Sequence, residues 1–290
     1  MSAVNIIEAL EDRGLFGGLP VFKDLTSWQP WLAFLRAVYG LHLSPEDVAL
    51  FRHHTGRQEP REGGYPEAVC IVGCQSGKSQ IAALVGVYEA AQAVMRGDTG
   101  VYVPLVAQDL RGAQRALFRY VQEAVAASAI LENEVVRKTT ETIELGGVSL
   151  VVYPCRPAAV RGIRAACAVI DELAFFTSTD GHATDTEMLR TLRTRLATTG
   201  GKLLILSSPY AQTGALWNLH RRHYGQEDSP TLIWQATAPE NEPDAASGLL
   251  ATDVGRRSRG LSLRSPRRIP RRARHALRPR GPRRGAGGLA

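Results

Sequence analysis

The chain contains 290 residues, of which 44% are hydrophobic and 22% are charged, a length and composition typical of one or two globular domains with a sizeable core. Its first residues, MSAVNIIEALEDRG, have neither the basic start nor the apolar stretch of a secretory signal. No apolar run reaches the ~18 residues that span a bilayer, so we expect neither a secreted nor a membrane protein. The cysteines Cys70, Cys74, Cys155 and Cys167 form no C-x-x-C pair, which argues against a metal centre and favours reduced thiols in the cytoplasm.

Charge is distributed unevenly along the chain. The formal net charge is +7, but residues 251–290 hold 13 arginines and a single acid, so residues 1–250 carry 22 basic and 27 acidic residues, a net charge of −5. An argument from overall charge to nucleic-acid binding therefore fails for the body of the chain. The segment from Gly255 to Ala290 uses eight residue types without periodicity, and we expect it to be disordered. It is either a basic arm for DNA phosphates or, as the GC-rich codons of its residues favour, the product of a frameshift.

Helices and strands are predicted to alternate along the chain. An amphipathic helix is expected at 28–39, and Ser44 caps a second helix that begins with a proline and two acids. After the polar loop 57–66 the predicted elements are a strand at 67–72, a helix from Lys78 to about Met95, a strand at 101–107, a helix at 108–127, a hairpin at 141–153, a strand at 165–170, a helix at 183–196, a strand at 202–207, a helix at 214–224 and a strand at 232–236. Strands that are apolar on both faces and separated by helices predict an α/β fold, a parallel sheet covered on both sides.

The stretch VGCQSGKSQ, residues 72–80, joins the first strand to the long helix. The usual phosphate loop reads G-x-x-x-x-G-K-[ST]. Here the end of the pattern fits, but Val72 occupies the first glycine position and Gly73 follows one place later. In such a loop backbone N–H groups surround the phosphates, the lysine reaches the β- and γ-phosphates of ATP and the serine binds Mg²⁺. The predicted nucleotide-binding residues are Gly73, Gln75, Ser76, Gly77, Lys78 and Ser79, with Lys78 also catalytic; the alternative is a strand–turn–helix with an accidental GKS.

Two further motifs end predicted strands. AACAVIDELAFF, residues 165–176, places Asp171 and Glu172 after an apolar strand, roughly 90 residues beyond the loop. We expect Asp171 to hold Mg²⁺ together with Ser79, and Glu172 to orient and activate the attacking water, although adjacent acids also begin solvated turns. Ser207 and Ser208 end the strand 202–207, where their hydroxyls would face the same crevice and sense the γ-phosphate, unless they only form a polar turn.

The segments GCQSGKS (73–79), PAAVRGIRAACAVIDELAFF (157–176) and LLILSSPYAQTGALW (203–217) together resemble the large terminase subunit of tailed bacteriophages, over roughly residues 25–240. The resemblance implies a RecA-like P-loop NTPase that uses ATP and Mg²⁺ to move double-stranded DNA into a capsid. It also implies a homo-oligomeric ring, the portal protein and the small terminase subunit as partners, and a place in the bacterial cytoplasm, transiently at the procapsid portal. Displaced glycines are typical of phosphate loops in that family.

The resemblance also suggests individual roles. A Trp-Gln pair commonly reads adenine in this family, and Trp28 and Gln29 match it, with Trp28 or Trp31 packing nearby or serving the core. Ser207 and Ser208 fall on the family's coupling motif. Arg161 is a possible arginine finger, or else a solvated or DNA-facing side chain. Cys74 stands where the family usually has an arginine, so slower hydrolysis is expected.

The expected domain organisation is an N-terminal helical segment at 1–60, a P-loop ATPase core at 61–240 and a linker with a disordered tail at 241–290. Terminases usually continue into a nuclease domain, and after Ala236 no acid lies on a predicted strand, so no nuclease activity is expected. The leading interpretation is the ATPase motor domain. A non-catalytic prophage fragment and a helicase-like remodelling ATPase remain as alternatives.

Overall fold

The computed structural model describes residues 4–108, 117–176 and 184–237. These residues all fall in the first of two compact units, Met1–Ala246. The boundaries expected near residues 60 and 240 stay predictions, and the tail expected to be disordered lies outside the described residues.

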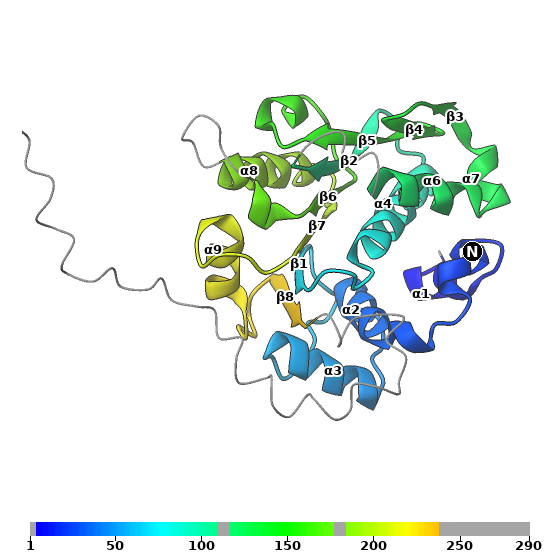
Figure 1. Ribbon diagram of the computed structural model, residues 1–290. Coiled ribbons are helices and arrows are strands. Elements are labelled where there is room, and N and C mark those ends of the chain that lie inside the picture. Colours follow the sequence, from blue (N-terminus) through cyan, green and yellow to red (C-terminus); the bar gives the residue numbers. More distant parts are fainter. Residues whose placement is uncertain (1–3, 109–116, 177–183, 238–290) are drawn as a thin grey trace, which may run out of the picture. The chain divides into compact units, whose positions relative to one another are not determined.

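The described part of the chain forms one eight-stranded sheet, in the order β3-β4-β5-β2-β6-β7-β1-β8 (Figure 1). Six of its strands run parallel, while β3 and β4 add an antiparallel edge. The strands are β1 (Glu67–Val72), β2 (Val101–Ala107), β3 (Val135–Lys138), β4 (Thr142–Leu145), β5 (Val148–Pro154), β6 (Cys167–Asp171), β7 (Lys202–Ser207) and β8 (Thr231–Ala236).

Helices cover both faces of this sheet, as the apolar strands predicted. They are α1 (Ile6–Glu11), α2 (Gln29–Tyr39), α3 (Pro45–Thr55), α4 (Lys78–Met95), α6 (Arg119–Ala126), α7 (Ala129–Asn133), α8 (Thr184–Leu196) and α9 (Gly214–His223). None of the helices in the described ranges is long and apolar enough to cross a membrane. Residues 109–116 of the helix expected at 108–127 lie outside the described ranges.

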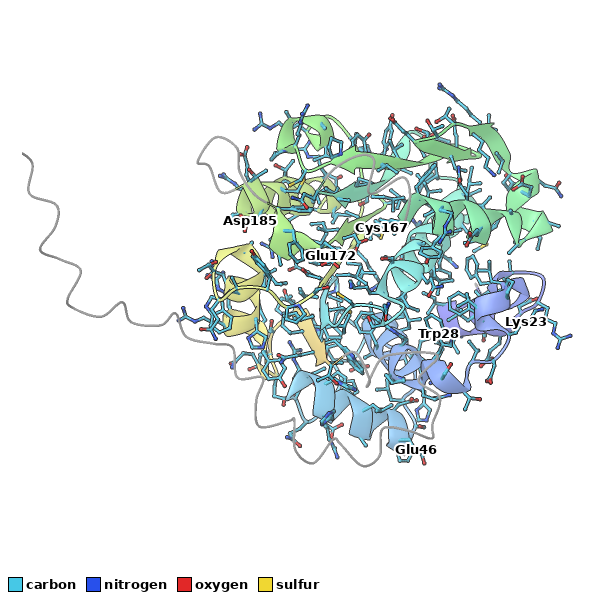
Figure 2. The ribbon with its side chains drawn as sticks, in the orientation of Figure 1. Lys23, Trp28, Glu46, Cys167, Glu172 and Asp185 are labelled. Atoms are coloured by element: carbon cyan, nitrogen blue, oxygen red, sulfur yellow. The ribbon has the colours of Figure 1, made fainter. Side chains whose placement is uncertain are left out.

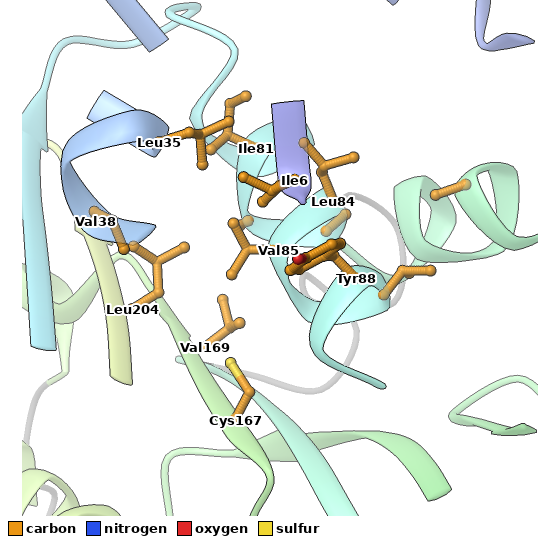
Figure 3. Close-up of a cluster of buried hydrophobic side chains, with 14 of the residues drawn as sticks. Ile6, Leu35, Val38, Ile81, Leu84, Val85, Tyr88, Cys167, Val169 and Leu204 are labelled. Atoms are coloured by element: carbon orange, nitrogen blue, oxygen red, sulfur yellow. The ribbon is translucent and has the colours of Figure 1, made fainter. Parts of the chain in front are cut away.

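The two hydrophobic clusters follow the alternation of side chains along each strand. On β1, Cys70 faces the larger cluster with α1, α2, α4 and α6, whereas Val69 faces the smaller one with α8 and α9. Figure 3 shows the larger cluster, where Ile6 of α1 and Val85 of α4 pack above Val169 of β6. This packing holds α4 against the sheet.

The strand order decides what lies at the carboxyl edge of the sheet. β7 is hydrogen-bonded to β6 on one side and to β1 on the other. The segments that follow β1, β6 and β7 are therefore neighbours. These are the three segments in which the sequence placed the phosphate loop, the acidic pair and the two serines.

Candidate active site

The loop between β1 and α4 adopts a conformation that exposes backbone donors. Gln75 has a φ of 65° and Gly77 a φ of 77°; the first is uncommon for a residue with a side chain. No side chain caps α4. Among the described residues, the backbone N–H groups of Ser76, Gly77, Lys78 and Ser79 donate no hydrogen bond to a protein atom. Unpaired donors at the start of a long helix form an anion-binding site.

Lys78 reaches from this loop to the ends of β6 and β7. Its Nζ lies 3.1 Å from Glu172 Oε1 and 3.1 Å from Ser208 Oγ, and 3.4 Å from the carbonyl oxygen of Gly73. The lysine side chain is only 9% exposed. Its charge therefore lies inside the site, at the position where phosphate oxygens would compete with the carboxylate for it.

Glu172 is held in an unusual backbone conformation. Its φ is 59°, in the left-handed region that a non-glycine residue keeps only when its surroundings enforce it. The Ser208 backbone N–H donates to Glu172 Oε2 at 2.8 Å and the Ser208 hydroxyl donates to Oε1 at 3.0 Å. The Glu172 side chain is 31% exposed, so part of it is in contact with solvent.

Asp171 offers a free oxygen for a cation. Ser79 Oγ donates to Asp171 Oδ2 at 3.3 Å, while Oδ1 is buried and has no hydrogen-bond partner in the described part of the chain. Burial, followed by the neighbouring Glu172 charge, raises the pKa of Asp171 to about 6, against the opposing effect of Lys78. A cation bound to Oδ1 would relieve both the missing partner and the unfavourable charge.

These oxygens fit Mg²⁺, which binds through one or two carboxylates, waters and substrate phosphates. Within the described residues no group of three or more His, Cys, Asp or Glu side chains gathers to hold a metal ion on its own. That Ser79 and Asp171 hold Mg²⁺ together with a phosphate stays a prediction.

The two serines after β7 have different partners. Ser208 contacts Lys78 and Glu172, and its Oγ lies 3.7 Å from the Cys74 sulfur. Ser207 is fully buried; its Oγ accepts from the Ala174 N–H at 3.0 Å and donates to the Ser208 carbonyl oxygen at 3.1 Å. Ser208 is thus part of the charged cluster, and Ser207 braces the turn that follows Glu172.

Three residues with predicted roles, Trp28, Gln29 and Arg161, do not contact the charged cluster in the described part of the chain. Trp28 is buried, donates from Nε1 to the Val21 carbonyl oxygen at 3.1 Å and packs edge-on against Phe22. Figure 2 shows it beside α2, apart from Glu172. Gln29 is exposed at the start of α2. Arg161 is exposed and forms an ion pair with Glu187 at 2.6 Å. The adenine and arginine-finger roles of these residues stay predictions.

One contact of the site had no signal in the sequence. The Trp31 indole nitrogen, Nε1, donates to the carbonyl oxygen of Ser76 at 2.7 Å, across 45 positions of the chain. Trp31 is completely buried. From the sequence, Trp31 was expected in the core or near adenine; in the structure it lies against the phosphate loop.

Comparisons with known proteins agree with the fold. No family model and no curated protein matches the sequence. A point mutant of the large terminase ATPase domain from Thermus phage P74-26 matches with a TM-score of 0.50 and 15% identity, over 72% of this chain and 87% of that chain. The same domain without the mutation gives 0.49 and 16% over the same shares. The HK97 bacteriophage large terminase gives 0.47 and 14%, over 67% of this chain and 39% of that chain.

The first of these similarities, taken with the strand order, shows that the chain shares the α/β fold of that ATPase domain, a mostly parallel sheet covered by helices. The fold class expected from the sequence is therefore confirmed.

Proposed function

We propose that this chain is the ATPase domain of a phage DNA-packaging motor, in which hydrolysis of Mg-ATP is coupled to movement of double-stranded DNA into a capsid. The observation that carries the proposal is the cluster of Lys78, Glu172 and Ser208 beside a loop of unpaired N–H groups. A structural role alone does not explain why so many donors and charges meet at one sheet edge. The similarity in fold to a terminase ATPase domain supports the same proposal.

Phosphate binding would redistribute the contacts of Lys78. The free N–H groups of the loop would receive the phosphate oxygens, and Nζ would leave Glu172 for the β- and γ-phosphates. Ser79 and Asp171 would hold Mg²⁺, which neutralises charge on the phosphate oxygens when bound. Because Lys78 and Glu172 are paired here, substrate would release the carboxylate as it binds.

Glu172 would then serve as the base. Ser208 would still donate to both carboxylate oxygens of Glu172, so the carboxylate would keep its position after Lys78 leaves it. A water oxygen would attack the γ-phosphorus as the bond to the bridging oxygen of ADP breaks, and Glu172 would take the proton that the water loses. Ser208 touches both Lys78 and Glu172, so it is suited to sense the loss of the γ-phosphate.

The partners of the motor belong to this proposal. Double-stranded DNA, the portal protein, the small terminase subunit and a ring of copies of this chain follow from the proposed packaging role. Arg161 would have to leave Glu187 before it could act as an arginine finger on a neighbouring copy.

A second candidate function is a nucleotide-binding fragment that does not hydrolyse ATP. The observation in its favour is Cys74, an exposed thiol in the phosphate loop that supplies no positive charge to the γ-phosphate. A helicase-like enzyme would differ from both by separating DNA strands.

Steady-state ATP hydrolysis with Mg²⁺, with and without double-stranded DNA, tests the proposal. We expect turnover that DNA stimulates without strand separation, and that Lys78→Ala and Glu172→Gln each abolish. Glu123→Gln on α6 is the control, because its carboxylate is exposed and pairs with Arg119 away from the cluster, and it should leave turnover unchanged. A folded parent protein that binds Mg-ATP without turnover would favour the non-catalytic fragment.

A further inference from the structure

Trp31 joins a helix outside the site to the phosphate loop. It lies on α2, and the only polar atom of its side chain, Nε1, donates to the Ser76 carbonyl oxygen at 2.7 Å. Both residues are 0% exposed, so water cannot take the place of either partner. A buried carbonyl oxygen that loses its donor carries the full cost of desolvation. The orientation of this carbonyl is therefore set by Trp31.

The carbonyl orientation also decides where the next N–H group points. The Ser76–Gly77 peptide is trans, like every other described peptide bond, and a planar trans peptide directs its C=O and N–H in opposite directions. With the Ser76 oxygen turned toward α2, the Gly77 N–H points away from α2. It is one of the donors of the loop that have no protein partner in the described residues.

The same peptide could rotate if it were not held. Gly77 has a φ of 77°, and glycine adopts positive and negative φ with similar ease. A flip would turn the Ser76 oxygen toward the bound phosphates and the Gly77 N–H away from them. A carbonyl oxygen facing a phosphate is repulsive, so the flipped loop would bind nucleotide poorly.

We propose that Trp31 is a positioning residue for phosphate binding, which holds the Ser76–Gly77 peptide with its N–H toward the phosphates. The inference rests on the proposed nucleotide site and goes beyond it, because it assigns control of the loop to a side chain of α2. Trp31 itself touches no substrate in this arrangement.

Trp31→Phe tests the proposal, because phenylalanine keeps an aromatic ring and removes the donor. Trp234→Phe is the matched control: Trp234 is 0% exposed, packs edge-on against the same Phe34 as Trp31, and its Nε1 has no partner in the described residues. Titration calorimetry should show that Trp31→Phe weakens Mg-ADP binding about tenfold, whereas Trp234→Phe leaves the affinity unchanged. The two variants should lose similar amounts of thermal stability. Equal affinities for the two variants would overturn the proposal.

A spectroscopic test needs no change at Trp31. The chain has four tryptophans, and Phe variants of Trp28, Trp217 and Trp234 assign their indole ¹⁵N–H signals, which leaves the fourth to Trp31. Mg-ADP should shift the Trp31 signal and leave the Trp234 signal in place. A Trp31 signal that does not respond, in protein that binds Mg-ADP, would contradict the proposal.

Lys78→Ala separates this inference from the function on which it rests. If Lys78→Ala leaves Mg-ADP binding intact, the nucleotide site itself is wrong. If Lys78→Ala removes binding but Trp31→Phe matches Trp234→Phe, the site stands and the role of Trp31 fails.

Discussion

Ser208 holds both oxygens of the Glu172 carboxylate, one through its backbone N–H at 2.8 Å and the other through its hydroxyl at 3.0 Å. The two residues lie 36 positions apart and follow neighbouring strands, β6 and β7. The contact therefore joins the proposed base to the strand end that also meets Lys78. It also explains why Glu172 keeps a φ of 59°.

Ser208→Ala should slow hydrolysis more than it weakens nucleotide binding. The variant loses the hydroxyl contacts to Glu172 and Lys78 and keeps the backbone N–H bond. Hydrogen bonds to charged groups contribute ~1.5–3 kcal/mol, so we expect kcat to fall about tenfold or more, with a change in the Mg-ADP dissociation constant of less than about threefold. Steady-state kinetics and calorimetry measure the two effects.

Ser207→Ala is the neighbouring comparison. Within the described residues the Ser207 hydroxyl bonds only to backbone groups, the Ala174 N–H and the Ser208 carbonyl oxygen, so its loss should lower thermal stability first. If Ser207→Ala and Ser208→Ala reduce kcat equally in stable proteins, the distinct role given to Ser208 is wrong.

Cys74→Arg should accelerate hydrolysis. Cys74 is exposed and lies near Ser208, so a longer side chain has room to turn toward the γ-phosphate. A guanidinium there would stabilise charge in the transition state, an effect worth several powers of ten in other phosphoryl-transfer enzymes. We expect a rise in kcat of at least about tenfold.

Cys74→Lys is the control for that substitution, because it adds the charge without the planar fork of arginine and should give a smaller rise. An unchanged kcat in Cys74→Arg, with nucleotide binding preserved, would show that the missing charge is not what limits this chain.

Much of this site could be predicted from the sequence because each of its parts is a short contiguous segment of the chain. The run EAVCIV could only be a strand buried on both faces, and the structure buries every residue of β1. Asp171 and Ser207 end strands of the same kind, and parallel strands bring their carboxyl ends together. The motifs thus converge in the fold as the pattern predicted, although their roles in catalysis stay predictions.

Other features depend on partners that the sequence does not reveal. Helix α1 spans only Ile6–Glu11, too short for a periodic signal; it is stabilised by burial of Ile6 and Leu10 in the larger cluster. The edge strand Val135–Lys138 is largely exposed and exists through its pairing with β4. The Trp31–Ser76 bond is likewise a product of tertiary packing.

Glu89→Gln should stabilise the protein increasingly as the pH rises from 4 to 7. Burial raises the pKa of Glu89 above its usual 4.5, although the Tyr39 hydroxyl bond and the Lys202 charge oppose this. A raised pKa means that the folded state binds the proton more tightly than the unfolded state. This contribution is fully present below pH 4.5 and is lost as the pH rises through the folded-state pKa.

The glutamine variant lacks this loss, so the difference in unfolding free energy between variant and parent should grow across that range. Urea denaturation of both proteins at several pH values measures it, and titrations of other groups cancel in the difference. A difference that stays constant with pH would mean that Glu89 ionises in the folded state as easily as in the unfolded chain.

Arg57→Ala should be among the most destabilising single changes in the described part of the chain. Arg57 is 0% exposed; its guanidinium donates to the carbonyl oxygens of Ser229 and Thr231 and lies 5.1 Å from the Tyr65 ring centroid. Its removal leaves a cavity and unpaired carbonyl oxygens next to the edge strand β8, so we expect the free energy of unfolding to fall by roughly 3 kcal/mol or more.

Arg52→Ala on α3 is the control for Arg57→Ala: the ion pair of Arg52 with Glu59 is exposed at both ends, and such pairs contribute about 1 kcal/mol or less. Urea denaturation of the two variants should separate them by at least about 2 kcal/mol, and equal losses would show that the buried contacts of Arg57 do not anchor β8.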